Sequence, residues 1–144
     1  MNSFILPLHG FLRWIVLGLA FWVFISFYHA IYAAKPYTQT YDRLAKFYLS
    51  FLHIQLLLGL FLYFYASPWI DFHMKNTEFS LWMKDPEIRY KMLEHPVTMF
   101  LGILLSQVGR IWGRRLGINT RRFKIEVLFY TLGLILIISR IPWG

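Results

Sequence analysis

Long apolar stretches, separated by polar segments, set the pattern of this chain. Four stretches approach the ~20 apolar residues that an α-helix needs to cross the hydrocarbon core of a bilayer. They cover roughly residues 8–33, 44–66, 96–113 and 125–141, and the third is the shortest. The pattern predicts four transmembrane helices and an outer loop over residues 67–95, in which Pro86 to Glu94 is a candidate surface helix.

The connections between the first two and the last two stretches are short, which is typical of antiparallel helix bundles. We therefore expect an all-α membrane protein: a single domain, residues 1–144, folded as an up-down-up-down bundle of four transmembrane helices. The composition agrees, because 58% of the residues are hydrophobic and only 15% are charged. Soluble domains are typically ~45–50% apolar and ~25% charged. The expected surroundings are therefore the lipid bilayer.

Basic residues concentrate next to the apolar stretches. Residues 110–124 hold six Lys or Arg residues and no acid. Excess Lys and Arg marks the cytoplasmic side of a membrane helix, so the net charge of +8 indicates topology rather than nucleic-acid binding. We expect both termini on the outer side of a bacterial inner (cytoplasmic) membrane, and no nucleic acid as a partner. The same charge also suits anionic lipid headgroups.

Three histidines, His9, His53 and His95, lie on or just inside the apolar stretches. An ionisable side chain in a bilayer is costly, so each needs a partner, a water path or a ligand. A helical rise of ~1.5 Å per residue places His9 and His95 near the outer ends of their helices. By the same rise His53 lies ~15–20 Å deeper, near the middle of the second stretch.

Charged residues accompany the two outer histidines. Arg13 lies one turn deeper than His9 on the same helical face, and Glu94 adjoins His95. Arg140 lies near the outer end of the fourth stretch. The sequence therefore predicts one outer layer of imidazoles, guanidinium groups and a carboxylate.

Two helical stripes stand out in the third and fourth stretches. Small residues on such stripes let membrane helices approach closely, and they can also leave room beside a helix for a flat macrocycle. The charged ends of the second stripe indicate that it faces into the bundle. The first stripe is His95, Met99, Gly102, Ser106, Gly109 and Gly113; the second is Glu126, Phe129, Gly133, Leu136 and Arg140.

Five segments of the chain together resemble a known family of proteins. They are His9 with Leu12-Arg13-Trp14, His53 to Pro68, Glu94-His95-Pro96, Gly109-Arg110 and Ser139 to Trp143. In this order, over nearly the whole chain, they resemble a group of small four-span bacterial membrane proteins called cytochrome b-like. The resemblance implies haem b binding and electron transfer, with His9, His53 and His95 as the matching imidazoles.

A haem b site inside the bundle is the first hypothesis, since haem iron takes histidine as an axial ligand and four-helix bundles hold haem. His9 and His95 match best in depth, and His53 is the alternative ligand. Arg13 and Arg140 suit haem propionates, because guanidinium binds carboxylate bidentately, or they neutralise Glu94. We expect an electron-transfer subunit of a larger membrane complex rather than a stand-alone enzyme.

Three alternatives remain open. His9, His95 and Glu94, with His73 or Asp71, are candidate zinc or copper ligands. A quinone is a second candidate ligand near the outer histidines. The third alternative is a structural or accessory subunit in which Arg13, Glu94 and Arg140 form a buried ion network. The chain has no cysteine, which excludes iron–sulfur ligation and c-type haem attachment.

Overall fold

The computed structural model describes residues 2–143, and every regular element in that range is helical. The long helices are α1 (Asn2–Tyr32), α2 (Gln39–Phe61), α6 (His95–Arg115) and α7 (Thr120–Ser139). Between α2 and α6 lie the π-helical turn η1 (Leu62–Ala66), α3 (Pro68–Asn76), α4 (Phe79–Lys84), α5 (Pro86–Arg89) and the π-helical turn η2 (Tyr90–Glu94). The prediction of an all-helical fold is confirmed.

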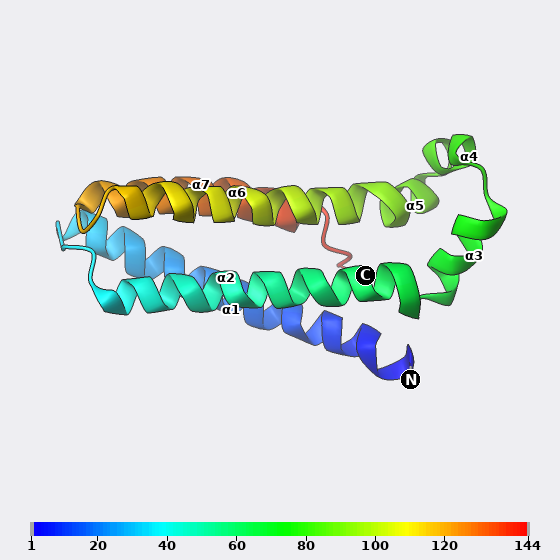
Figure 1. The fold of residues 1–144 in the computed structure, drawn as a ribbon, viewed down its shortest axis with the longest axis horizontal. Coiled ribbons are helices and arrows are strands. Elements are labelled where there is room, and N and C mark those ends of the chain that lie inside the picture. Colours follow the sequence, from blue (N-terminus) through cyan, green and yellow to red (C-terminus); the bar gives the residue numbers. More distant parts are fainter. Residues whose placement is uncertain (1, 144) are drawn as a thin grey trace.

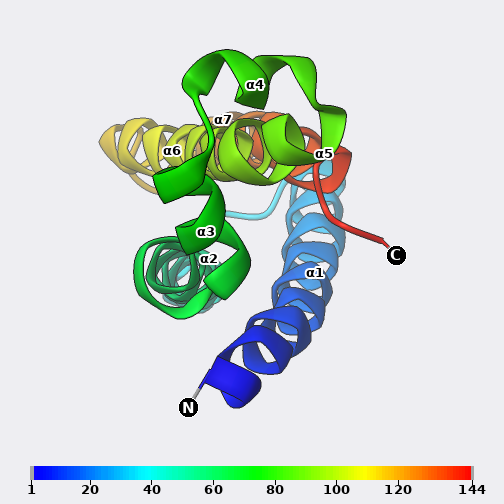
Figure 2. The ribbon, with the colours of Figure 1, turned by 90° about the vertical axis from the view of Figure 1, so that its right-hand side faces the viewer.

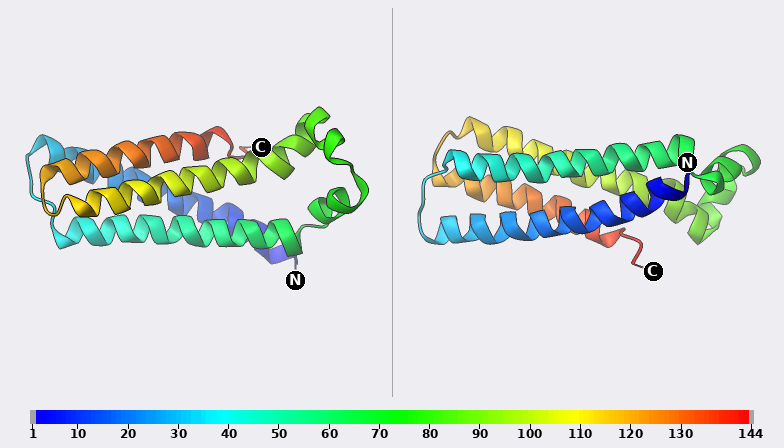
Figure 3. Two further views of the ribbon diagram at one scale, coloured as in Figure 1. Left: turned by 45° about the horizontal axis from the view of Figure 1, so that its top comes forward. Right: turned by 90° about the horizontal axis from the view of Figure 1, so that it is seen from below.

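The long helices lie side by side in two layers, α1 with α2 and α6 with α7, and consecutive ones run in opposite directions (Figure 1). The view along the helices shows the two layers stacked (Figure 2). Helix α1 packs on α2 and α7, α2 packs on α6, and α6 packs on α7. The connections 33–38 and 116–119 lie at one end, which we call the basic end (Figure 3). Helices α3 to α5 lie at the opposite end, the α3 end, and bridge the layers.

An aromatic core holds the basic end together. The rings of Phe27 and Phe123 lie edge to face with centroids 5.1 Å apart, and Tyr48 packs on Tyr130 at 5.4 Å. All four side chains are fully buried. Edge-to-face aromatic pairs contribute beyond the area that they bury. This core joins α1, α2 and α7 where the chain makes its turns.

Helices α6 and α7 pack most closely, and the two predicted stripes form their contact. A Cβ atom placed on Gly102 would lie 2.8 Å from the carbonyl oxygen of Gly133, and one on Gly113 would lie 2.6 Å from Cγ of Glu126. A Cβ on Gly109 would overlap Phe129. Only glycine allows backbones to approach this closely. The small residues therefore serve helix packing along this face.

The segment predicted as an outer loop is largely helical. The expected surface helix over residues 86–94 is present as α5 and η2, which run directly into α6. The Asp85 carboxylate accepts the backbone N–H groups of Glu87 and Ile88 at 2.9 and 3.0 Å, and such N-caps stabilise helix starts. Helices α3 and α4 were not predicted, because with nine and six residues they are too short to show a helical period in the sequence.

Large apolar side chains cover the outside of the molecule; Phe4, Phe21 and Trp22 are each more than 60% exposed. Two helical stretches in the described range are long and apolar enough to cross a membrane, Phe4–Tyr32 and Gln39–Ala66. In the most apolar part of each, only 28% and 22% of the residues are buried. The third and fourth predicted spans correspond to α6 and α7, whose buried residues include Arg110 and Glu126.

Candidate functional site

His95, the first residue of α6, is held in a fixed orientation at the α3 end. Its Nδ1 lies 2.7 Å from the carbonyl oxygen of Arg140, and the Tyr90 hydroxyl donates to the same oxygen at 2.7 Å. A carbonyl oxygen only accepts hydrogen bonds, so Nδ1 carries the proton. The lone pair of the neutral imidazole is then on Nε2, which is the arrangement that metal-ligating histidines have.

His9 lies across the bundle from His95 and within electrostatic range of it. It packs against α2 at Gly59, where an added Cβ would lie 3.2 Å from Cε1 of the imidazole. The backbone carbonyl oxygen of His9 accepts the Gln55 side-chain amide at 2.8 Å. The imidazole itself is less satisfied: its Nδ1 is buried and has no hydrogen-bond partner in the described chain.

Arg13, Glu94 and Arg140 lie at the same end, as predicted. Glu94 forms ion pairs with Arg89 at 2.8 Å and with Arg140 at 3.2 Å. Arg13 does not join this carboxylate; it donates through Nη1 to the carbonyl oxygen of Pro142 at 2.8 Å. Its Nε is buried without a partner among the described residues. We call His9, Arg13, Glu94, His95 and Arg140 the histidine site.

The predicted buried network of Arg13, Glu94 and Arg140 is therefore only partly formed. Glu94 pairs with Arg140, and Arg13 is not part of the network. The Glu94 side chain is 30% exposed and that of Arg140 is 43% exposed. Glu94 also contacts Arg89, which lies on α5. These pairs fix the C-terminal turn against the start of α6, but they do not form a closed ionic core.

His53 lies away from the histidine site. It is exposed on α2, and its Nδ1 donates to the carbonyl oxygen of Leu49 at 2.7 Å. It lines a groove between α2 and α6 with a volume of about 490 Å³. His9 and His95 do not line this groove, so the three imidazoles divide into a pair and a separate residue.

Helical geometry explains the position of His53. Leu49 and Leu52 of α2 are buried, whereas His53 is on the adjacent outer face. His53 is therefore separated from His9 and His95 by its expected depth along the helix, and it also lies on the outer face of α2.

The predicted zinc or copper ligands are not assembled. In the range 2–143 no group of three or more His, Asp and Glu side chains is placed to hold a metal ion. His73 donates from Nδ1 to the Trp69 carbonyl oxygen at 2.8 Å and stacks on the Trp69 ring. Asp71 pairs with Lys75 at 2.8 Å. We do not propose a non-haem metal site.

A buried ion cluster lies at the basic end, and the sequence analysis did not predict it. We use this name for Asp42, Arg110, Arg122 and Glu126. Arg110 contacts Asp42 at 2.6 Å and Glu126 at 3.2 Å. Arg122 contacts Asp42 at 2.7 Å and Glu126 at 2.8 Å. Each guanidinium thus bridges the same two carboxylates, and Glu126 is completely buried.

Two tyrosines complete the hydrogen bonding of Glu126. The hydroxyls of Tyr37 and Tyr130 donate to Oε2 of Glu126 at 2.8 and 3.1 Å. Burial, followed by the negative charge of Glu126, raises the pKa of Tyr37 above its usual range, so this hydroxyl remains a donor. Buried charges are tolerated when they are paired and their remaining positions are hydrogen-bonded. The cluster meets both conditions.

The cluster gives two of the basic residues in the segment 110–124 a structural role that the sequence did not predict. Arg110 and Arg122 are buried, and the turn between the helices is shorter than predicted because α6 continues to Arg115. One sequence signal was available: Arg122 and Glu126 are spaced i, i+4, which places them on one helical face. Asp42 gave no signal of the cluster, since the two arginines that it contacts, Arg110 and Arg122, are 68 and 80 positions away.

No protein-family profile, curated protein or solved structure matches this chain.

Proposed function

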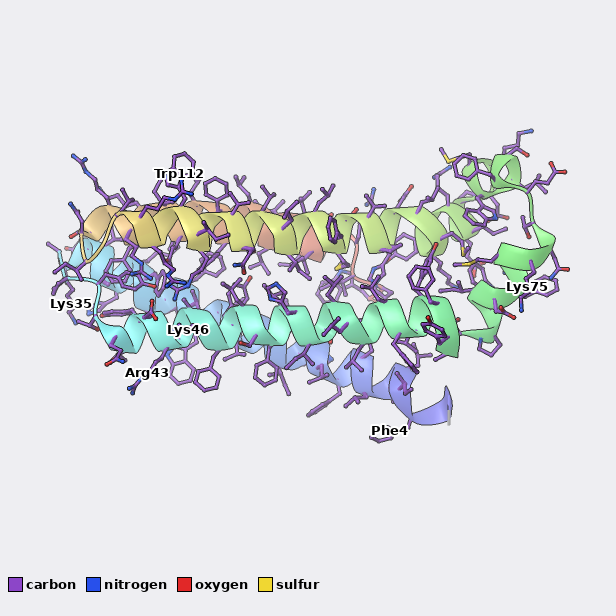
Figure 4. All side chains as sticks on the ribbon, viewed as in Figure 1. Phe4, Lys35, Arg43, Lys46, Lys75 and Trp112 are labelled. Carbon is purple, nitrogen blue, oxygen red and sulfur yellow. The ribbon has the colours of Figure 1, made fainter. Side chains whose placement is uncertain are left out.

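We propose that the chain is an integral membrane protein whose four long helices cross the bilayer up-down-up-down, with both termini outside the bacterial inner membrane. The exposed aromatic and aliphatic side chains of α1 and α2 support this, because a soluble monomer rarely exposes so large an apolar surface. The charges support the orientation: Lys35, Arg43 and Lys46 lie toward the basic end (Figure 4). An excess of such residues marks the cytoplasmic side.

Single cysteines test this topology, and the chain has no native cysteine to remove. In intact spheroplasts, S80C on α4 is expected to react with a membrane-impermeant maleimide. I118C at the basic end, where Ile118 is 74% exposed, is expected to react only after permeabilisation. The control is labelling of both variants in detergent, where the two cysteines are expected to react equally. Labelling of I118C in intact spheroplasts would contradict the orientation.

We further propose that the histidine site holds haem b, and that His9 and His95 would bind its iron. The main support for this proposal is the orientation of His95. Its Nδ1 donates to the Arg140 carbonyl oxygen, which leaves the lone pair of Nε2 for a metal. His9 supplies a second imidazole, whose buried Nδ1 has no hydrogen-bond partner among residues 2–143. A porphyrin contributes four nitrogen donors, so two protein ligands suffice where a bare metal ion needs three or four.

The arginines of the site fit the acidic groups of such a ligand. Arg13 retains an unpartnered Nε one turn below His9, and guanidinium groups bind carboxylates bidentately. The charge of Arg140 is paired with Glu94, and its contact with His95 is made through the backbone carbonyl oxygen. Arg13 is therefore the better candidate for a propionate.

When bound, haem b supplies reversible one-electron redox chemistry. The protein's own contribution is to hold His95 in one tautomer and to keep the site near the outer surface. We propose that the chain transfers electrons within a larger membrane complex, and that a quinone is a further candidate ligand at the same end.

Alanine substitutions test the ligand assignment. H9A and H95A are each expected to abolish the Soret and reduced α bands of the purified protein, since each removes an axial ligand. H53A is expected to keep both bands, because His53 lies in the separate groove. H73A is the matched control, as His73 also donates to the carbonyl oxygen four residues earlier. Unchanged haem content in H9A and H95A would exclude this site.

A structural or accessory subunit is the second candidate function, and the buried ion cluster favours it. The cluster joins α2, α6 and α7, and its acidic and basic groups pair with one another. A protein whose role is to brace a complex needs such a fixed end and no cofactor. A colourless purified protein with no bound metal would favour this function over electron transfer.

A further inference from the structure

We propose that the groove between α2 and α6 binds an anionic phospholipid of the cytoplasmic leaflet, with the phosphate between Lys46 and Arg114. This inference rests on the proposed membrane insertion but not on haem binding. The groove has a volume of about 490 Å³, which is large enough for part of a lipid. It is lined by Lys46, Leu49, Ser50, His53, Ile54, Gln107, Arg110 and Arg114.

Positive charge is in excess at one end of the groove. Its lining includes three cations and no carboxylate. Two carboxylates behind the groove, those of Asp42 and Glu126, contact Arg110 and Arg122 and neutralise their charges. Lys46 shares Asp42 with both arginines, and Arg114 makes no ion pair with a described residue. Four cations thus face two carboxylates, which leaves net positive charge for an anionic headgroup.

The polarity of the groove changes along its length. Among the lining residues, Lys46 is nearest the basic end on α2 and Arg114 is nearest on α6. Ser50 lies about one turn beyond Lys46, and Gln107 lies about two turns beyond Arg114. Their hydroxyl and amide groups are donors that suit the ester carbonyls of a glycerolipid. Leu49 and Ile54 supply apolar walls for the start of an acyl chain.

This combination of cations, neutral polar groups and apolar side chains in one groove matches a phospholipid rather than a small soluble anion. The groove opens on the exposed face of α2, where Leu57 and Phe61 continue the apolar surface toward the α3 end. An acyl chain can follow that surface, whereas a free phosphate gains nothing from it. Basic residues near a membrane surface attract anionic lipid at about 1 kcal/mol each.

The test is lipid binding measured by native mass spectrometry on the full chain in detergent. Dioleoylphosphatidylglycerol is titrated against dioleoylphosphatidylcholine, and inorganic phosphate is added as a competitor. Wild type is expected to retain the phosphatidylglycerol preferentially and to be unaffected by millimolar phosphate. The double variant K46Q/R114Q is expected to lose about thirtyfold in affinity for it, from two headgroup charges.

The matched control is R121Q/K124Q, which removes two exposed basic residues at the same end that do not line the groove. It is expected to retain the phosphatidylglycerol within about twofold, since a bound headgroup contacts the groove and not the surface at large. S50W, which fills the groove without changing its charge, is expected to lose both lipids. An equal loss in both double variants would show that surface charge alone attracts the lipid, and would overturn the inference.

The result is separable from the proposed function. K46Q/R114Q is expected to remain in the membrane fraction with an unchanged absorption spectrum. If the wild-type chain does not fractionate with membranes, the proposed insertion fails. If it does, but binds the two lipids equally, the lipid site alone is excluded.

Discussion

Replacing Glu126 by glutamine is expected to lower the free energy of unfolding by about 3–5 kcal/mol, the cost of removing one partner from a buried ion pair. The side chain is completely buried and contacts Arg110 and Arg122. E126Q keeps the size of the side chain but leaves two guanidinium groups to share Asp42. Thermal unfolding in detergent, followed by circular dichroism, measures the effect as a fall in Tm.

The control for this experiment is E87Q. Glu87 pairs with Lys91 at 2.7 Å, and both side chains are largely exposed to solvent. Exposed pairs of this kind contribute about 0–1 kcal/mol, so the Tm is expected to change little. Equal Tm values for E126Q and E87Q would mean that the ion cluster does not stabilise the basic end.

The second large effect is expected at the contact between α6 and α7. A side chain on Gly133 meets the backbone of Gly102 and, at 2.5 Å, the hydroxyl oxygen of Ser106. Backbone cannot move aside as a flexible side chain can, so G133L forces the two helices apart. Overpacking costs typically about 1–3 kcal/mol and occasionally more; we expect the upper end. The protein is expected to unfold at a markedly lower temperature or to aggregate during purification.

Gly18 offers a matched control on α1, because nothing lies within 4 Å of a Cβ placed there. G18L changes the same residue type to the same side chain in a long helix. It is expected to leave Tm unchanged or to raise it slightly, since leucine favours helix over glycine. A comparable loss of stability in G18L and G133L would show that the close contact is not the cause.

Much of the helical framework could be predicted from the sequence, because helix-length apolar stretches alternate with polar segments that contain Pro or Gly. The sequence also indicated the contact face of α6, since Gly102, Ser106 and Gly109 fall on one stripe and are all buried. His9 and His95 were correctly expected at one end, because depth follows directly from the helical rise. Each of these features depends on local spacing.

The features that could not be predicted from the sequence depend on contacts between positions far apart in the chain. Arg110 and Asp42 contact each other across 68 positions, and nothing local distinguishes Arg110 from the surface arginines near it. The position of His53 was similarly ambiguous, because the second stretch is apolar on all faces and its period does not say which face is buried. Helix packing decides both, and only the structure supplies it.

The ion cluster and the histidine site differ in how completely their side chains are satisfied. At the basic end, each charge of the ion cluster has at least two partners. At the α3 end, His9 and Arg13 keep buried nitrogens without partners in the described range. Buried polar atoms without partners are uncommon and call for an explanation. The ligand that we propose for the histidine site would account for both.

The absorption spectrum of the purified wild-type protein, oxidised and reduced, tests the proposed haem site most directly. The proposal predicts a Soret band and a reduced α band of the b type, with haem and protein in equal amounts. A protein that is colourless after expression with an adequate haem supply, and blank in a full metal analysis, would contradict it and leave the structural function in its place.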